Sequence, residues 1–298
     1  MKSLPFLNPV AGSPAARNPG RPAVIVPTQA IDAERLAADC AAATATGIVD
    51  AVEWRIDPLL AAASGSAQGG AHSGVHGLAE AALRLLPHAL TAGLPILLTV
   101  RTGFEGGQVE ITEDDYAEAV RALIGGIAEV GVGDGTAADA DAVAVAAASG
   151  IPGSGTSGVP VAVDVEIDRA DSDSLIASAR ESGVPVVASH HNFEATDSAD
   201  RLLRTFAAMS EAGADVAKVA MMPQEPADVL RLLEATAAAD VSAAHPVLGI
   251  SMGPLGRTSR IMGADFGSCA TFAQIGQASA PGQIDAVVLA EILDRVTG

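Results

Sequence analysis

Lysine is nearly absent from this chain of 298 residues, where it occurs only as Lys2 and Lys218. Basic residues of both kinds number 17 against 36 acidic ones, which gives a formal net charge of -19 and a pI of about 4.5. A surface this acidic repels nucleic acid and anionic membranes. We therefore expect neither as a partner.

Cysteines and long apolar runs are also scarce. Cys40 and Cys269 are the only cysteines; they form neither a disulfide framework nor a thiolate metal site, and they fit a reducing compartment. Polar residues interrupt every apolar window well short of the ~20 residues that a membrane helix needs, and no basic start leads into an apolar stretch. We expect a cytoplasmic protein with a large core.

Apolar and β-branched runs alternate with amphipathic segments along the chain. Strands are predicted at 23–28, 49–56, 95–102, 160–167, 185–191, 216–222, 246–251 and 269–273, and helices at 31–43, 78–92, 114–130, 173–182, 198–212, 226–239, 258–262 and 284–296. Such alternation implies parallel strands, and eight units in about 270 residues predict an α/β fold of the (β/α)₈ TIM barrel type. No Gly-x-Gly-x-x-Gly follows the first strand, which disfavours a dinucleotide-binding fold.

The domain organisation is expected to be simple. Residues 1–21 are rich in Pro, Gly, Asn and Ser and are predicted to form a flexible N-terminal arm, ahead of a single catalytic barrel over 22–298. Two stretches rich in Gly, Ala and Ser, near 61–77 and 131–158, are interpreted as flexible insertions in loops. Within the second, 142–147 fits a short strand or a short helix equally well.

Lys218 lies inside the apolar run VAKVAMMP at 216–223, where burial is expected. A desolvated amine beside arginine side chains loses its proton readily and can attack a carbonyl, whereas guanidinium cannot. A lysine near a strand end can instead extend its ammonium to solvent. The placement of the other charged residues favours the first interpretation.

Those charged residues gather near the carboxyl ends of the predicted strands. Alternate residues of a strand share a face, and in a barrel the carboxyl ends form the face on which active sites are built. One pocket is therefore predicted, although ion pairs that brace the barrel mouth are the alternative. The set comprises Glu53, Arg55, Asp57, Arg101, Asp164, Glu166, His191 and Lys218.

This set supports imine chemistry on a ketone. Lys218 can form an iminium that acidifies the adjacent C–H, and His191 can take that proton and deliver it to a leaving hydroxyl. Glu105, on the loop after the third strand, either orients His191 or is solvated. Arg101 and Arg260 suit a carboxylate, so the implied substrate is a small anionic ketone. His190 has the opposite parity, and no third metal ligand lies at local spacing, so no metal is predicted.

Seven short segments follow one another along the chain and together form a pattern. They are EWRID at 53–57, Arg101 with EGG at 105–107, SHHNF at 189–193, KVAMMP at 218–223, SMG at 251–253 with Ser259 and Arg260, FGS at 266–268 and SAPGQ at 279–283. In this order they resemble type I 3-dehydroquinate dehydratase, also called type I 3-dehydroquinase. The resemblance covers the chain from about residue 23 to its end.

The resemblance implies a barrel that dehydrates 3-dehydroquinate to 3-dehydroshikimate in aromatic amino-acid biosynthesis, as a homodimer without metal or cofactor. It implies Lys218 as the Schiff-base lysine, His191 as the general acid–base and Glu105 as the partner of this histidine. Ring hydroxyls would be held by Glu53 and Arg55. The remaining substrate-binding residues would be Arg101, Arg260, Ser279 and Gln283, with Arg260 on the carboxylate and the 279–283 loop closing over the site.

The chain departs from the family pattern at Asn192, at Asp197 and at Pro27, where an aspartate, a proline and a small hydroxyl residue are expected. Two other functions remain open. An aldolase-type Schiff-base lyase would need a phosphate site after strands seven and eight, but no glycine-rich cradle lies there. A non-catalytic dehydroquinate-binding barrel would be favoured by loss of the lysine or the histidine, and both are present.

Overall fold

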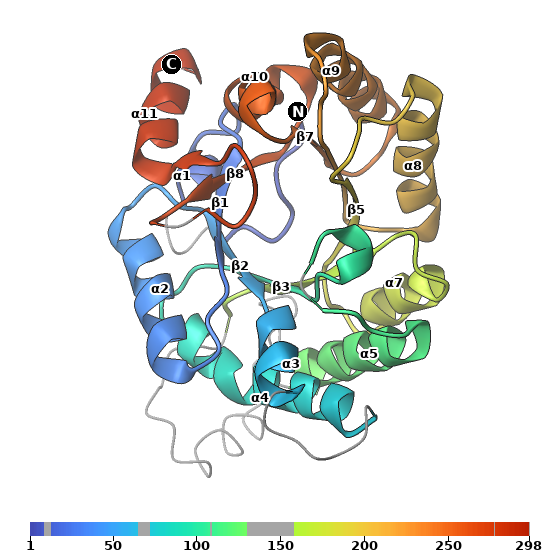
Figure 1. The fold of residues 1–298 in the computed structure, drawn as a ribbon. Coiled ribbons are helices and arrows are strands. Elements are labelled where there is room, and N and C mark those ends of the chain that lie inside the picture. Colours follow the sequence, from blue (N-terminus) through green and yellow to red (C-terminus); the bar gives the residue numbers. More distant parts are fainter. Residues whose placement is uncertain (9–12, 65–71, 108, 130–157, 277, 298) are drawn as a thin grey trace.

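A computed structural model describes residues 1–8, 13–64, 72–107, 109–129, 158–276 and 278–297 (Figure 1). Its parallel sheet has the strand order β7-β6-β5-β4-β3-β2-β1-β8-β9. A bridge between Val247 and Ser268 joins the β7 and β8 segments, and the amide of Cys269 donates to Val247 O at 2.9 Å. The sheet is therefore rolled up, and the predicted (β/α)₈ barrel is confirmed.

The strands are β1 (Ala23–Thr28), β2 (Ala51–Arg55), β3 (Ile96–Thr99), β4 (Val161–Glu166), β5 (Val186–Asn192), β6 (Val216–Met221), β7 (Val247–Ser251), β8 (Ala270–Gln274) and β9 (Ile284–Asp285). The helices are α1 (Pro14–Arg17), α2 (Ala33–Ala45), α3 (Asp57–Ser64), α4 (His72–Leu90), α5 (Glu113–Glu129), α7 (Ser172–Glu181), α8 (Ala199–Ala212), α9 (Pro226–Ser242), α10 (Arg257–Ile261) and α11 (Ala286–Thr297), with short 3₁₀ turns η1 (Gly103–Glu105), η2 (Pro254–Gly256) and η3 (Gly263–Phe266).

All eight predicted strands are present, with shifted ends. The third was predicted to run to 102, but β3 ends at Thr99 and the chain then turns into η1, which places Glu105 above the barrel. The predicted helix at 284–296 begins two residues late, because Ile284 and Asp285 first pair with Ala273 and Gln274 as β9.

Alternation along the strands separates two apolar layers. Val52, Trp54 and Ile56 of the β2 segment pack outward among the helices that surround the sheet in Figure 1, and the Trp54 indole donates to Ala30 O at 3.0 Å. The residues of opposite parity face the barrel interior, where an apolar layer includes Leu97 and Leu248. The charged side chains of the strands share the inward face with this layer.

The amino-terminal segment differs from the flexible arm that its composition predicts. Leu4 and Phe6 are 3% and 2% exposed and belong to the apolar cluster of the barrel interior. Lys2 Nζ and the Met1 amine both pair with Asp240, at 2.9 and 3.2 Å. The described part of residues 1–21 therefore covers apolar surface of the barrel, and its Pro and Gly content gave no sign of this packing.

The two predicted insertions differ in outcome. Part of 61–77 is helical, because α3 continues to Ser64 and α4 begins at His72. Residues 65–71 lie outside the described residues, as does nearly all of 131–158, including the undecided run 142–147. In the described part of the chain, no helix is both long enough and apolar enough to cross a membrane.

Candidate active site

Lys218 lies in the middle of β6, level with Ser189 of β5 and Leu248 of β7. Its neighbours Ala217 and Val219 pack outward, so parity turns the lysine into the barrel, where it is 4% exposed. Its Nζ lies 4.6 Å from the centre of the Phe272 ring, 3.5 Å from Glu53 Oε1 and 3.8 Å from Asp164 Oδ2. The amine is thus enclosed, and its nearest charges are carboxylates rather than the arginines expected.

A histidine–carboxylate pair lies at the carboxyl end of β5. His191 Nδ1 is 2.7 Å from Glu105 Oε2, a position that the η1 turn gives to Glu105. Burial lowers the pKa of His191 well below its usual value, and the positive charges of Arg101 and Lys218 act in the same direction. Burial also raises the pKa of Glu105, against the pull of Arg101. A neutral imidazole is therefore favoured, and it can accept a proton.

Arg101 forms the centre of a buried charge cluster. Its Nη1 donates to Glu105 at 2.7 Å and to Glu166 at 3.0 Å, and its Nη2 donates to Asp164 at 2.8 Å. Burial alone would lower the pKa of Arg101, but the three carboxylates raise it well above its usual value. Arg101 was predicted to bind substrate, but both of its terminal nitrogens already donate to carboxylates.

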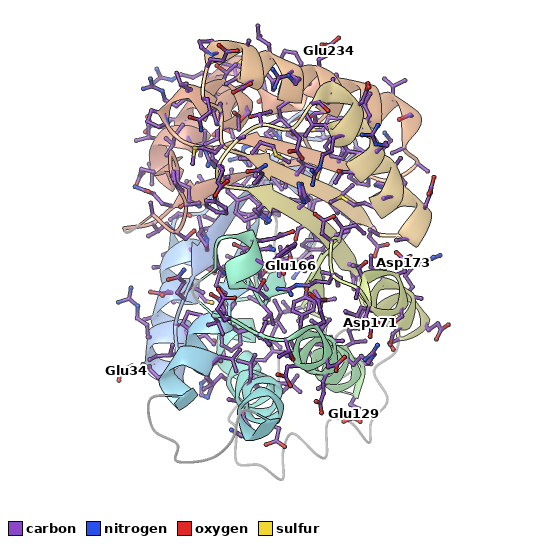
Figure 2. All side chains as sticks on the ribbon, turned by 45° about the vertical axis from the view of Figure 1, so that its right-hand side comes forward. Glu34, Glu129, Glu166, Asp171, Asp173 and Glu234 are labelled. Carbon is purple, nitrogen blue, oxygen red and sulfur yellow. The ribbon has the colours of Figure 1, made fainter. Side chains whose placement is uncertain are left out.

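A second arginine supports this cluster from outside. Figure 2 shows Glu166 inside the molecule next to η1, while Asp171, just before α7, and Asp173, on α7, lie outside. Arg169 Nε donates to Glu166 at 2.9 Å, and its guanidinium lies 5.0 and 4.9 Å from the rings of Phe104 and Tyr116. The sequence analysis missed Arg169 and Tyr116, because they lie on a loop and a helix outside the strand-end pattern.

Arg260, on α10, is in a different electrostatic position. It is 2% exposed, its Nη1 donates to Phe272 O at 3.1 Å and its Nη2 donates to Pro281 O at 3.0 Å. Its Nε has no hydrogen-bond partner, and within the described residues no carboxylate forms an ion pair with it. Burial lowers the pKa of Arg260 to about 10. This guanidinium is suited to an incoming anion.

The 279–283 loop is held next to Arg260. Gln283 Oε1 accepts from the Ser279 amide at 2.9 Å, and its Nε2 donates to Ser279 Oγ at 3.2 Å. The amide of Gly253 donates to Pro281 O at 3.0 Å. Gly282 has φ 77°, and a Cβ there would lie 2.3 Å from Gly253 O, so glycine permits this close approach.

One pocket collects the predicted residues. Its volume, counted together with the solvent space at its open mouth, is about 710 Å³. Glu105 does not line it and contacts His191 from behind. Arg55, at the wall, is held by Asp57 at 2.7 Å. The predicted residues on the wall are Glu53, Arg55, Arg101, His191, Lys218, Arg260, Ser279 and Gln283, joined by Gln29, Phe193, Met252 and Phe272, which the sequence analysis did not single out.

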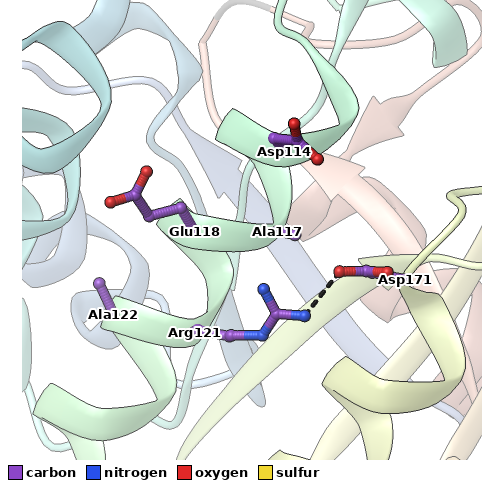
Figure 3. Close-up of a pocket in the computed structure, with 6 residues that line it drawn as sticks. All are labelled: Asp114, Ala117, Glu118, Arg121, Ala122 and Asp171. Atoms are coloured by element: carbon purple, nitrogen blue, oxygen red, sulfur yellow. Dashed lines mark hydrogen bonds and ion pairs between the residues drawn. The ribbon is translucent and has the colours of Figure 1, made fainter. Parts of the chain in front are cut away.

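A second hollow lies on the outside, between α5 and α7 (Figure 3). An ion pair on its wall joins Arg121 to Asp171 at 2.6 Å, with side chains 47% and 51% exposed. The other residues on its wall are Asp114, Ala117, Glu118 and Ala122. Among the described residues that line it there is no lysine, histidine or cysteine, so it is not a candidate for the chemistry described above.

Comparison with known proteins agrees with this geometry. The family model for type I 3-dehydroquinase matches residues 24–149 and 155–297. The 3-dehydroquinate dehydratase of Klebsiella pneumoniae is 34% identical over 259 residues, covering 84% of this chain and 85% of that one. The enzyme of the same name from Enterococcus faecalis is 32% identical over 277 residues, covering 92% of each chain.

Solved structures agree as well. The type I 3-dehydroquinate dehydratase of Clostridium difficile, with covalent modified comenic acid, has a TM-score of 0.71 at 27% identity and 93% coverage of both chains. The 3-dehydroquinate dehydratase of Geobacillus kaustophilus has a TM-score of 0.69 at 27% identity, with 92% of this chain and 91% of that chain covered. With this fold, and with a family model that matches nearly the whole chain, the protein belongs to the type I 3-dehydroquinase family.

Proposed function

We propose that this chain dehydrates 3-dehydroquinate to 3-dehydroshikimate through a Schiff base on Lys218, as a step of aromatic amino-acid biosynthesis. The observation that carries the proposal is that three groups meet at one pocket: an enclosed amine, a histidine backed by a carboxylate, and a guanidinium for which the described residues offer no ion-pair partner. Family membership favours this function over an aldolase-type lyase. The presence of both Lys218 and His191 favours it over a non-catalytic binding barrel.

Binding begins with the substrate carboxylate. Arg260 is the arginine available for it, because its charge is not neutralised by a described carboxylate and its Nε lacks a partner. Ser279 and Gln283 would close over the bound anion from the neighbouring loop. Glu53 and Arg55, on β2, would hold ring hydroxyls. Since Arg101 already holds three carboxylates, its main part would be to order Glu105 beneath the substrate.

The reaction follows from the placement of the amine. The Lys218 amine attacks the ketone carbon to form a carbinolamine, whose hydroxyl takes up a proton from solvent and leaves as water. The iminium that remains carries a positive charge, which Glu53 and Asp164 stabilise. His191 removes the proton from the carbon next to the iminium and returns it to the departing hydroxyl, so that water leaves and a double bond forms. A second water hydrolyses the iminium, which releases the enone and restores the amine.

We propose a homodimer in the cytoplasm that needs neither metal nor cofactor for the dehydration. The covalent modified comenic acid in the Clostridium difficile relative supports a nucleophilic group in pockets of this family. The acidic surface of this chain fits a small anionic substrate only because the pocket itself carries arginine, lysine and histidine.

Borohydride trapping tests the covalent step. Incubation with 3-dehydroquinate and borohydride is expected to leave one stable adduct per chain on Lys218, because reduction converts the iminium to a secondary amine. Peptide mass spectrometry identifies the site unambiguously, since Lys2 is the only other lysine. Borohydride without substrate is the control. Adduct on Lys2 or on the amino terminus would overturn the assignment.

Replacement of Arg260 tests carboxylate binding. Arg260→Met is expected to raise KM by on the order of 10²-fold and to lower kcat less, because a buried ionic hydrogen bond to the substrate is lost in both the ground and the transition state. Steady-state kinetics measure the split. Arg257→Met is the matched control, since Arg257 lies one turn earlier on α10 and is exposed. An unchanged KM would mean that a residue other than Arg260 binds the substrate carboxylate.

A further inference from the structure

The two oxygens of Glu105 have different surroundings. Oε2 accepts from Arg101 at 2.7 Å and lies 2.7 Å from His191 Nδ1. Oε1 is fully buried and has no hydrogen-bond partner; it lies 3.9 Å from Nδ1 of the neighbouring His190. A buried carboxylate oxygen without a partner is costly. It faces away from the substrate pocket, whose wall does not include His190.

The other side of this gap holds a contact between a histidine and an aspartate. His190 is 5% exposed, and its Nδ1 lies 2.8 Å from Asp168 Oδ2, close enough to act as a hydrogen-bond donor to that carboxylate, although the contact lacks regular hydrogen-bond geometry. Among the residues described by the structure, Glu105, Asp168 and His190 each offer one ligand atom, and the three atoms lie within 4.8 Å of one another. Asp168 is exposed, so the gap has an opening to solvent.

We propose that Glu105, Asp168 and His190 bind a divalent cation of the zinc or cobalt type behind the catalytic pair. Two ligands at about 2.1 Å from a tetrahedral ion are ~3.4 Å apart. The separations here, 2.8 Å from His190 Nδ1 to Asp168 and 3.9 Å to Glu105, lie on either side of that value. One imidazole and two carboxylates suit such ions, and solvent at the open side would complete the coordination.

The other ring nitrogen of His190 supports the same assignment. Its Nε2 lies 3.3 Å from Asp197 Oδ2. A metal-bound histidine characteristically donates its second N–H to a carboxylate, which fixes the ring orientation and the tautomer. The sequence did not reveal this site, because Glu105, Asp168 and Asp197 lie on three different loops and none stands at a metal-binding spacing from His190.

A cation at this position would compete for the catalytic carboxylate. Glu105 would be drawn toward His190, and its hold on His191 would weaken. If the proposed function is correct, the ion therefore slows dehydration reversibly, and the chelated enzyme is the faster form. Only this consequence rests on the proposed function; the binding site itself does not.

Cobalt absorption tests the site without any assay of turnover. Chelator-treated protein is titrated with Co²⁺, whose visible bands are intense in a four-coordinate protein site, and then with Zn²⁺ as competitor. We expect one equivalent of Co²⁺ to bind, and we expect His190→Gln and Asp168→Asn each to weaken binding by at least ~10-fold. Asp171→Asn is the matched control, since this nearby exposed aspartate is outside the cluster and should leave Co²⁺ binding and turnover unchanged.

Two results would overturn the site. Wild-type protein that binds no Co²⁺ or Zn²⁺ at millimolar concentration would mean that water or a proton occupies the gap. Equal binding by wild type, His190→Gln and Asp168→Asn would place the ion elsewhere. If His190→Gln fails to fold, Asp168→Asn still tests the site, because Asp168 is exposed and its replacement should not unfold the protein. If the protein binds the metal but does not dehydrate 3-dehydroquinate, the proposed function is wrong while the metal site is supported.

Discussion

Lys218→Ala is expected to reduce dehydration to the uncatalysed background, a loss on the order of 10⁴-fold or more, because the covalent route disappears with the amine. No second amine can replace it. Lys2 and the amino terminus are the other amines of the chain, and both are held by Asp240 at 2.9 and 3.2 Å. The absorbance of the conjugated enone product measures the rate directly.

The matched control uses the chain's other lysine. Lys2→Ala removes an amine that lies outside the pocket, and it should leave kcat and KM close to wild type. Lys218→Arg keeps a positive charge between Glu53 and Asp164 but supplies no nucleophile, so it separates charge from imine formation. Substantial turnover by Lys218→Arg would mean that the reaction proceeds without a Schiff base.

His191→Ala is expected to lower kcat by ~10²- to 10⁴-fold, because the proton transfers in both directions lose their carrier. The effect on the covalent step is predicted to be different. Lys218 remains enclosed by Phe272, Glu53 and Asp164, so the variant should still form the iminium. Rapid mixing with borohydride trapping would then show the adduct accumulating while product formation is slow.

The adjacent histidine provides the comparison for this variant. His190→Gln alters a ring that does not line the substrate pocket, and it should lower turnover of chelator-treated enzyme far less than His191→Ala does. Wild-type turnover by His191→Ala would assign the proton transfers to another group. Equal losses of turnover in the two variants would mean that both histidines act only by holding Glu105 in place.

Much of the barrel and its pocket could be predicted because both follow local rules. Burial on both faces produces the apolar runs of parallel strands, and their parity turns Glu53, His191 and Lys218 inward. Strand ends were less accurate, as at Thr99, where a tertiary turn rather than propensity ends β3. Arg101 was predicted to contact substrate, but whether its Nη atoms meet a substrate or a carboxylate depends on which side chains approach from β4 and η1.

Composition also misled where packing is long-range. A Pro- and Gly-rich start was interpreted as a flexible arm, yet Leu4 and Phe6 are buried with the barrel interior. The gap between Glu105, Asp168 and His190 had no local signal either, because its ligands come from the loops after β3 and β4 and from β5.

Residue order alone was enough to establish the family, the alternating architecture and the lysine on which the proposed chemistry depends. The architecture follows from periodicities of two and of 3.6 residues, the lysine from the rarity of that side chain, and the family from the resemblance of seven ordered segments. None of these requires knowledge of contacts between distant segments. The pairing of charges was settled only by the folded barrel. Among the described residues it left Arg260 without a carboxylate, brought Asp164 and Glu166 to Arg101 in addition to the nearby Glu105, and left one oxygen of Glu105 facing His190. Apart from the pair of Arg101 and Glu105, these contacts join segments far apart in the chain.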